Sequence, residues 1–330
     1  KSATWACSED AYSSEVEAQK ERIEQLNPSA IQRIRDIIKE RRINIVHTNT
    51  LGVSVAAEAA REEGVKHIWH LREFVKEDHH LRFVDDDYAN ELIGSSDLLI
   101  CISNAVYKKY AALYGAKKCR VIYNGIDPLS FFIPNRNLFC DQTIHLTVAG
   151  RLCEGKGQID AVEAMAALCK RHNNLRLSLV GETVHTDYVL SLKRLIREYS
   201  LGTKIEITGP ATHMDRIWAE TDIALITSRM EAFGRCAVEA MMAGSVVVGA
   251  NTGGTKEILQ DGCGYLYAPG NVSELVAVLE EVLSNKNDSR NTALKAQDMA
   301  VKRFSAKRNE EEIASVHCEL LEIGHCGGTD

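Results

Sequence analysis

Short apolar runs alternate with segments of helical pattern along most of this chain, and this alternation restricts its fold more than any other feature. Strand, helix and strand in repeated succession predict parallel sheets with helices on both faces. In such folds the ligand-binding loops follow the carboxyl ends of the strands. The runs expected to form strands lie at residues 43–50, 67–71, 97–103, 120–123, 143–149, 175–180, 204–208, 222–227 and 245–250.

The chain length predicts two domains, because 330 residues exceed what one hydrophobic core usually organises. The segment with Pro134 shows no periodicity and is therefore expected to be a linker. The last segment is expected to hold a helix that packs back on the first domain, and then a disordered tail at 324–330. The expected divisions are an N-terminal Rossmann-like domain at 1–128, a linker at 129–142, a second Rossmann-like domain at 143–303 and a final segment at 304–330.

The first of these domains is expected to be incomplete. Residues 1–14 are polar and show no strand pattern, and the first convincing strand begins at Ile43. A doubly wound domain normally starts with a strand and a glycine-rich loop. About two strand–helix units, of roughly 30 residues each, are therefore expected to be absent.

Charge and cysteine content exclude several classes of protein. The net charge of −7 argues against nucleic acid as the main partner. No apolar run approaches the roughly 20 residues that span a bilayer. The ten cysteines form no Cys-x2-Cys pair, which favours reduced thiols over a disulfide framework or a zinc site. We expect a cytoplasmic protein, and local basic patches leave open a peripheral contact with the inner face of the membrane.

Residues 79–87 mix imidazoles with carboxylates, a combination that metal ions can use. The acidic residues Asp85 to Asp87, however, stand directly before a helical pattern at 88–93. The helix dipole alone favours acidic residues at that place. The sequence therefore predicts no metal site here.

The apolar run at 222–227 leads through a loop into a helical pattern that begins after Gly234. A helix start offers unpaired N–H groups and a positive dipole end, which suit phosphate. Glu231 in the loop and Glu239 inside the helix are carboxylates, which accept hydrogen bonds from hydroxyls rather than bind phosphate. A ligand with both a diphosphate and sugar hydroxyls would use all of these groups. Taken alone, the two glutamates are better explained as ordinary side chains of a solvated helix.

Residues 150–158 contain the Gly-x4-Gly-Lys spacing of a phosphate-binding P-loop. Gly157 stands where a P-loop needs Ser or Thr to hold magnesium, so a nucleotide triphosphatase is disfavoured. Arg151 still offers a two-pronged guanidinium and Lys156 a point charge, both above a strand end.

Together these motifs resemble the GT-B-fold, retaining glycosyltransferases of family 4. The similarity covers residues 43–283, and the run from Trp69 to Phe74 with Asp78 and His79 resembles the branch that builds bacterial cell-surface polysaccharides. The matching groups are Gly150-Arg151-Leu152 with Lys156-Gly157, Glu231 and Glu239 around Phe233-Gly234, Thr252-Gly253-Gly254, Asn124-Gly125-Ile126-Asp127, Ile45-Val46-His47 and Ile100-Cys101-Ile102-Ser103.

The resemblance implies roles for individual residues. Arg151 and Lys156 would neutralise the donor diphosphate without a metal ion, Glu231 would hold hydroxyls of the donor sugar, and Glu239 would bind the ribose. In that family the donor phosphate itself is thought to deprotonate the acceptor, so no protein nucleophile and no cofactor are expected. The catalytic positions would be Arg151, Lys156 and Glu231. The loop at Thr208 and Gly209 would lie near the base of the nucleotide. The other donor-binding positions would be Gly150, Gly181, Ala232, Phe233, Gly234 and Arg235.

On the acceptor side the chain departs from the family pattern. Many members carry a histidine where this chain has Arg72, with His70 two residues earlier; together with Glu73 these residues are expected to face the acceptor. The expected activity is transfer of a hexose from a nucleotide diphosphate sugar, UDP-linked, to a saccharide or lipid-linked acceptor. The alternative, favoured by the incomplete first domain, is a non-catalytic GT-B-like module that binds a nucleotide or a partner.

Overall fold

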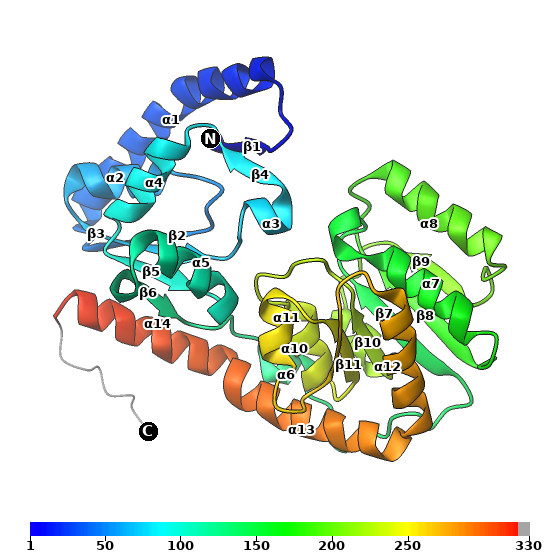
Figure 1. Ribbon diagram of the computed structural model, residues 1–330. Helices are drawn as coiled ribbons and strands as arrows, with labels where there is room; N and C mark the ends of the chain where they lie inside the picture. The colour runs from blue at the N-terminus through cyan, green and yellow to red at the C-terminus, as the bar shows by residue number, and fades with distance from the viewer. Residues whose placement is uncertain (323–330) are drawn as a thin grey trace. The chain divides into compact units, whose positions relative to one another are not determined.

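The computed structural model describes residues 1–322, which form two compact units (Figure 1). Unit 1 comprises residues 1–123 and the returning segment from Asn309 onward, whereas unit 2 is the continuous stretch Asn124–Arg308. Each unit is built on a parallel sheet, as the alternating pattern predicts. The tail expected at 324–330 lies outside the described residues.

Unit 1 contains a four-stranded parallel sheet in the order β2-β3-β5-β6. Its strands are β2 Ile45–Asn49, β3 Lys66–Leu71, β5 Leu98–Cys101 and β6 Cys119–Val121. Its helices are α1 Ser13–Arg41, α2 Val55–Glu63, α3 Lys76–His79, α4 Asp86–Ser95, α5 Asn104–Tyr114, η1 Ala116–Lys118 and most of α14 Ala306–Leu320.

Helix α14 closes one face of this sheet although it comes from the far end of the sequence. Its residue Val316 is 1% exposed and packs in one cluster with Ile68 of β3 and Ile100 of β5. These aliphatic side chains on neighbouring strands form an apolar surface that would be exposed to water without α14. The last described helix is therefore part of the core of unit 1.

The N-terminal segment differs from its prediction, because residues 1–14 are not strandless. They contain β1 Ala6–Ser8, which pairs antiparallel with β4 Leu81–Phe83 in a separate two-stranded sheet. Trp5 stacks on Trp69 with 5.5 Å between ring centroids and 5° between planes. A strand of three residues is too short for a periodic signal, and its position depends on distant partners.

Unit 2 contains a six-stranded parallel sheet in the order β12-β11-β10-β7-β8-β9. Its strands are β7 Ile144–Ala149, β8 Leu175–Val180, β9 Ile205–Thr208, β10 Ile223–Ile226, β11 Val246–Ala250 and β12 Tyr265–Tyr267. Its helices are α6 Pro128–Phe131, η2 Glu154–Lys156, α7 Gln158–Leu168, α8 Thr186–Glu198, α9 Met214–Glu220, α10 Arg235–Met242, α11 Gly253–Ile258, α12 Val272–Ser284 and α13 Lys286–Phe304.

The strand order of unit 2 reverses between β7 and β10. From β7 the chain proceeds outward through β8 to β9, and it then returns to the other side of β7 as β10. The loops at the carboxyl ends of β7 and β10 therefore lie at the topological switch point, which is where doubly wound sheets bind ligands.

The stretch 129–142, expected to be a linker, lies within unit 2. Arg136 donates to the carbonyl oxygens of Trp218, Thr221 and Ala243, the last at 3.0 Å. Phe139 is 7% exposed in the core of the unit. This segment has no periodicity because single residues rather than a regular face attach it to the sheet.

Candidate active site

The loops after β7 and β10 are joined to each other by direct hydrogen bonds. Thr227 Oγ1 donates to the carbonyl oxygen of Lys156 at 2.7 Å, and the backbone N–H of Arg229 donates to the carbonyl oxygen of Gly155 at 2.8 Å. Gly157 has φ +64°, and a Cβ there would collide with the carbonyl oxygen of Thr227. Only glycine fits this position, which explains why Gly157 stands where a P-loop would have Ser or Thr.

An ion pair fixes the second loop to helix α7. Arg229 Nη2 lies 2.8 Å from Asp160 Oδ1, and Nη1 contacts the other carboxylate oxygen. The Asp160 side chain is 4% exposed, whereas that of Arg229 is 45% exposed. The hydrogen bond to Asp160 raises the pKa of Arg229, so the guanidinium stays charged.

The glycine pair after β11 holds the backbone around Glu231. Gly254 N donates to the carbonyl oxygen of Glu231 at 2.7 Å. A Cβ at Gly254 would lie 2.6 Å from Phe233 Cα and would collide with the Phe233 carbonyl oxygen. Phe233 is 2% exposed and meets Phe304 edge-on, with ring centroids 5.5 Å apart. The backbone of residues 231–233 is therefore held by Gly254, and the Phe233 ring is held by Phe304.

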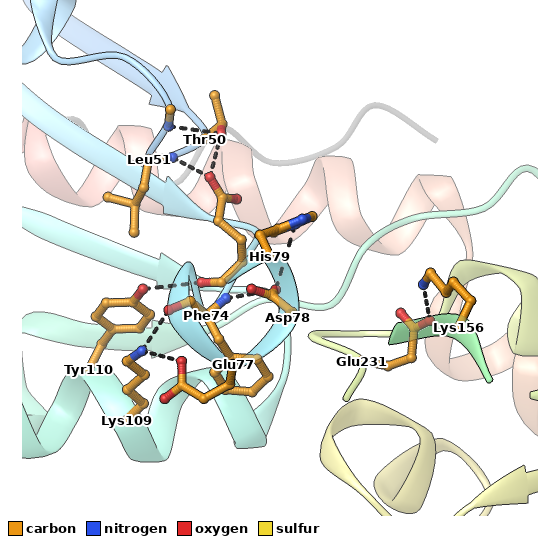
Figure 2. Close-up of polar contacts among 12 residues, drawn as sticks. Thr50, Leu51, Phe74, Glu77, Asp78, His79, Lys109, Tyr110, Lys156 and Glu231 are labelled. Atoms are coloured by element: carbon orange, nitrogen blue, oxygen red, sulfur yellow. Dashed lines mark hydrogen bonds and ion pairs between the residues drawn. The ribbon is translucent and has the colours of Figure 1, made fainter. Parts of the chain in front are cut away.

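Lys156 and Glu231 meet at the centre of these loops, as Figure 2 shows. Lys156 Nζ forms an ion pair with Glu231 Oε1, and Ser228 Oγ donates to the same oxygen at 2.7 Å. The Lys156 and Glu231 side chains are 24% and 17% exposed. This partly exposed ion pair thus places a cation suited to an anionic ligand beside a carboxylate suited to hydroxyl groups.

Glu239 lies inside α10 and is 6% exposed. Its Oε2 accepts a hydrogen bond from Trp218 Nε1 at 3.2 Å, and its Oε1 lies 3.3 Å from Arg235 Nη2. Trp218 is completely buried, so it fixes the orientation of the carboxylate. Cys236 between these groups has its pKa raised to about 12 by burial, and its thiol is therefore neutral.

The remaining predicted donor positions lie at the carboxyl ends of four neighbouring strands, β10, β7, β8 and β9. Gly150 N donates to the carbonyl oxygen of Val180 at 2.9 Å, and Gly181 N donates to that of Thr208 at 3.4 Å. A Cβ at Gly181 would collide with the Gly150 carbonyl oxygen, so these loops lie against each other. Arg151 and Gly209 are exposed at the same sheet edge, while Ala232 and Gly234 continue the Glu231 loop.

The three residues predicted for the acceptor side lie in unit 1 and differ in burial and in hydrogen-bond partners. His70 is 3% exposed within β3; burial, with Arg72 and His47 adding to it, lowers its pKa to about 3. Arg72 is exposed and donates to Asn49. Glu73 turns toward the loop after β2, where it accepts from Leu51 N at 2.5 Å. His70 is thus a neutral, buried side chain.

Sequence reasoning missed four side chains that build the unit 2 site. Asp160 and Arg229 form the ion pair, Ser228 orients Glu231, and Trp218 orients Glu239. Ser228 and Arg229 stand beside Glu231 in the sequence, which could have drawn attention to them. The positions of Asp160 and Trp218 carry no signal, because their partners are 69 and 21 residues away.

Within residues 1–322 there is neither a metal-binding cluster nor a membrane-spanning helix. In that range no group of three or more His, Cys, Asp or Glu side chains is arranged to hold a metal ion. None of its helices combines the length and apolar character required to cross a bilayer. The acidic residue Asp85 instead caps α4, accepting from Tyr88 N at 2.9 Å.

Two Rossmann-like units, each built on a parallel sheet, are the components of a GT-B fold. The chain belongs to the family described as Glycosyl transferases group 1, which matches residues 132–299, just over half of it. Residues 13–128 match the family described as Glycosyltransferase Family 4. The GT-B fold and the glycosyltransferase family expected from the motifs are thereby confirmed, whereas retention of configuration, the cell-surface polysaccharide branch and the incomplete first domain stay predictions.

Two curated proteins that are similar to this chain have names that fit this family. The chain is 28% identical over 218 residues to glycogen synthase of Mycobacterium tuberculosis, covering 64% of this chain and 52% of that protein. It is 25% identical over 243 residues to the uncharacterized glycosyltransferase MJ1607 of Methanocaldococcus jannaschii, covering 68% and 60%. The chain therefore spans little more than half the length of these curated relatives.

Solved structures share the fold. Anabaena HepE in complex with UDP-glucose superposes with a TM-score of 0.75 at 23% identity, over 88% of this chain and 82% of that one. A glycosyltransferase from Rickettsia africae gives a TM-score of 0.76 at 20% identity, over 88% and 80%. At this level of identity the similarity establishes the fold.

Proposed function

We propose that this chain transfers a hexose from a nucleotide diphosphate sugar, with UDP as the nucleotide, to a saccharide or lipid-linked acceptor with retention of configuration. The observation that carries the proposal is the cluster of Lys156, Glu231 and Ser228 between the loops after β7 and β10. It combines a cation for phosphate and a carboxylate for sugar hydroxyls in one partly exposed cluster. Family membership and a fold neighbour with bound UDP-glucose support the same donor class.

In the proposed reaction, the glycosidic bond to the donor phosphate breaks as a bond to the acceptor oxygen forms on the same face of the sugar. Arg151 and Lys156 neutralise charge that develops on the leaving diphosphate, so we assign that task to side chains rather than to a metal ion or cofactor. The departing phosphate oxygen receives the acceptor proton. Glu231 holds the sugar hydroxyls, and Glu239, oriented by Trp218, holds the ribose.

Binding measurements with UDP, UDP-glucose, UDP-galactose and UDP-N-acetylglucosamine test the donor half of this proposal. We expect at least one nucleotide sugar to bind more tightly than UDP, and Glu231→Ala to remove that difference. If no nucleotide sugar binds and Glu231→Ala behaves like the original chain, the proposal is wrong.

The second candidate is a non-catalytic module that binds a nucleotide or a partner. The observation that favours it is the ion pair between Lys156 and Glu231, in which the two groups satisfy each other without a ligand. Release of labelled sugar from a bound donor distinguishes the two candidates, because a binding module leaves the donor intact. We place the reaction in the cytoplasm, with peripheral contact at the inner face of a membrane if the acceptor is lipid-linked.

A further inference from the structure

Unit 1 contains a cavity of about 220 Å³ between the loop after β2 and residues 73–81. Its apolar walls are Ala6, Leu51, Val75 and Leu81, and its polar side is formed by Thr50, Glu73 and His79. Pockets for drug-sized ligands span roughly 300–1,000 Å³. This cavity therefore suits a ligand the size of a single ring.

Glu73 is held so that one of its two carboxylate oxygens is available to a ligand. Its Oε1 accepts from Leu51 N at 2.5 Å and from Thr50 Oγ1. Its Oε2 has no hydrogen-bond partner within residues 1–322. Trp69 Nε1 donates to the Thr50 carbonyl oxygen at 2.8 Å and so fixes the other side of this loop. The carboxylate is oriented before any ligand arrives.

The opposite wall is held in a strained conformation. Val75 has φ 75° and ψ −66°, the geometry of a γ-turn that β-branched residues rarely adopt. Figure 2 shows the contacts around the preceding residue: Asp78 Oδ2 accepts from Phe74 N at 2.9 Å, and Lys109 Nζ donates to Phe74 O at 2.6 Å. Lys109 also pairs with Glu77 at 2.6 Å. Strained backbone that several contacts maintain is common at ligand sites.

We propose that this cavity binds an uncharged, hydroxyl-bearing ring of the size of one sugar unit. Sugar rings present C–H groups that can pack on Leu51, Val75 and Leu81, while a hydroxyl donates to Glu73 Oε2. The same carboxylate repels phosphate, so the cavity rejects phosphorylated sugars. That the ring belongs to the acceptor rests on the transferase activity proposed above, whereas its binding can be tested without that activity.

The test uses the full chain with three neutral probes: the methyl glycosides of glucose, galactose and N-acetylglucosamine. Glucose 6-phosphate serves as the anionic probe, and binding is followed by saturation-transfer NMR titration. We expect at least one methyl glycoside to bind about tenfold more tightly than glucose 6-phosphate, and Glu73→Ala to weaken its binding about tenfold. If no methyl glycoside binds, or if glucose 6-phosphate binds equally well, the proposal is overturned.

Further variants separate loss of the site from loss of the fold. Glu73→Gln keeps an oxygen acceptor for Thr50 and Leu51 but removes the charge, so it is expected to admit glucose 6-phosphate. Gly52→Leu fills the cavity without backbone conflict, because a Cβ at Gly52 would meet only Thr50 Oγ1, at 3.5 Å. It is expected to abolish glycoside binding. Unchanged binding in Gly52→Leu contradicts the proposal.

Two controls identify the site that is being observed. Glu91→Gln changes an exposed carboxylate of unit 1 outside the cavity and is expected to bind glycosides normally. Glu231→Ala removes the proposed donor-sugar carboxylate in unit 2 and is also expected to leave glycoside binding unchanged. If Glu231→Ala loses it, the probes occupy the donor site and the cavity proposal fails. Absence of donor turnover with normal glycoside binding contradicts only the proposed reaction.

Discussion

Lys156 Nζ and Glu231 Oε1 form an ion pair across the loops that follow β7 and β10, with Ser228 Oγ donating to the same carboxylate oxygen. In the proposed reaction these two residues bind different parts of the donor, the phosphate and the sugar. The carboxylate therefore offsets part of the positive charge that a phosphate would meet. Donor binding must exchange this ion pair for contacts with the ligand.

Glu231→Gln tests that exchange. The substitution keeps a hydrogen-bond acceptor for Ser228 and removes the negative charge beside Lys156. We expect UDP without a sugar to bind up to about fivefold more tightly, the range of a partly exposed ion pair. The advantage of UDP-glucose over UDP should shrink in the same variant. Calorimetric titration measures both affinities, and weaker binding of UDP by Glu231→Gln would contradict the expectation.

Asp160 and Arg229 should respond unequally to substitution. Arg229→Leu leaves the carboxylate of Asp160, 4% exposed, without a partner, and is expected to lower the free energy of unfolding by about 3 kcal/mol or more. Asp160→Asn leaves a guanidinium that is already 45% exposed and can be hydrated, so about 1–2 kcal/mol is expected. Urea unfolding measures both. A larger loss in Asp160→Asn than in Arg229→Leu would refute this order.

Two glycines in neighbouring loops of unit 2 should differ in their tolerance of alanine. At Gly254 a Cβ would collide with the backbone of Phe233, whereas at Gly155 it would meet nothing within 4 Å. Gly254→Ala is therefore expected to displace the loop that carries Glu231 and to abolish UDP binding. Gly155→Ala is the matched control and should bind UDP normally. Equal UDP affinities in the two variants would show that the Gly254 contact does not support the site.

The stability of unit 1 should fall in mild acid. Burial lowers the pKa of His47 and of His67 to about 4 and that of His70 to about 3. Above pH 6.5 these imidazoles are neutral in both the folded and the unfolded state. As the pH falls from 6.5 toward 4, the unfolded state binds protons that the folded state does not. Each histidine then lowers the free energy of unfolding by up to about 1.4 kcal/mol per pH unit.

Denaturant unfolding between pH 7 and pH 5 measures this slope. His70→Phe removes one of the three imidazoles with a lowered pKa and keeps a ring of similar shape, so its unfolding free energy should depend less steeply on pH. Lys20→Gln, an exposed change on α1, serves as the control and should keep the original slope. Parallel curves for His70→Phe and the original chain would contradict the assignment.

The sequence predicted the two parallel sheets because buried strands such as β5 and β10 are continuous apolar runs with turn residues at their ends. It did not predict β1 or β12, each of three residues, since so short a run has no period. Lys156 and Glu231 were predicted as site residues because they stand in motifs with glycine. The Asp160–Arg229 pair and the Glu73 cavity form between segments that are distant in the sequence. Local sequence patterns do not predict such contacts.

The return of α14 to unit 1 has a consequence for biosynthesis. Unit 2 is continuous in sequence and is complete when residue 308 has left the ribosome, whereas unit 1 still lacks Val316 at that time. Domains fold as units during synthesis. We therefore expect the second unit to reach its native state first, while the sheet of unit 1 keeps an uncovered apolar face until the last turns of α14 have left the ribosome.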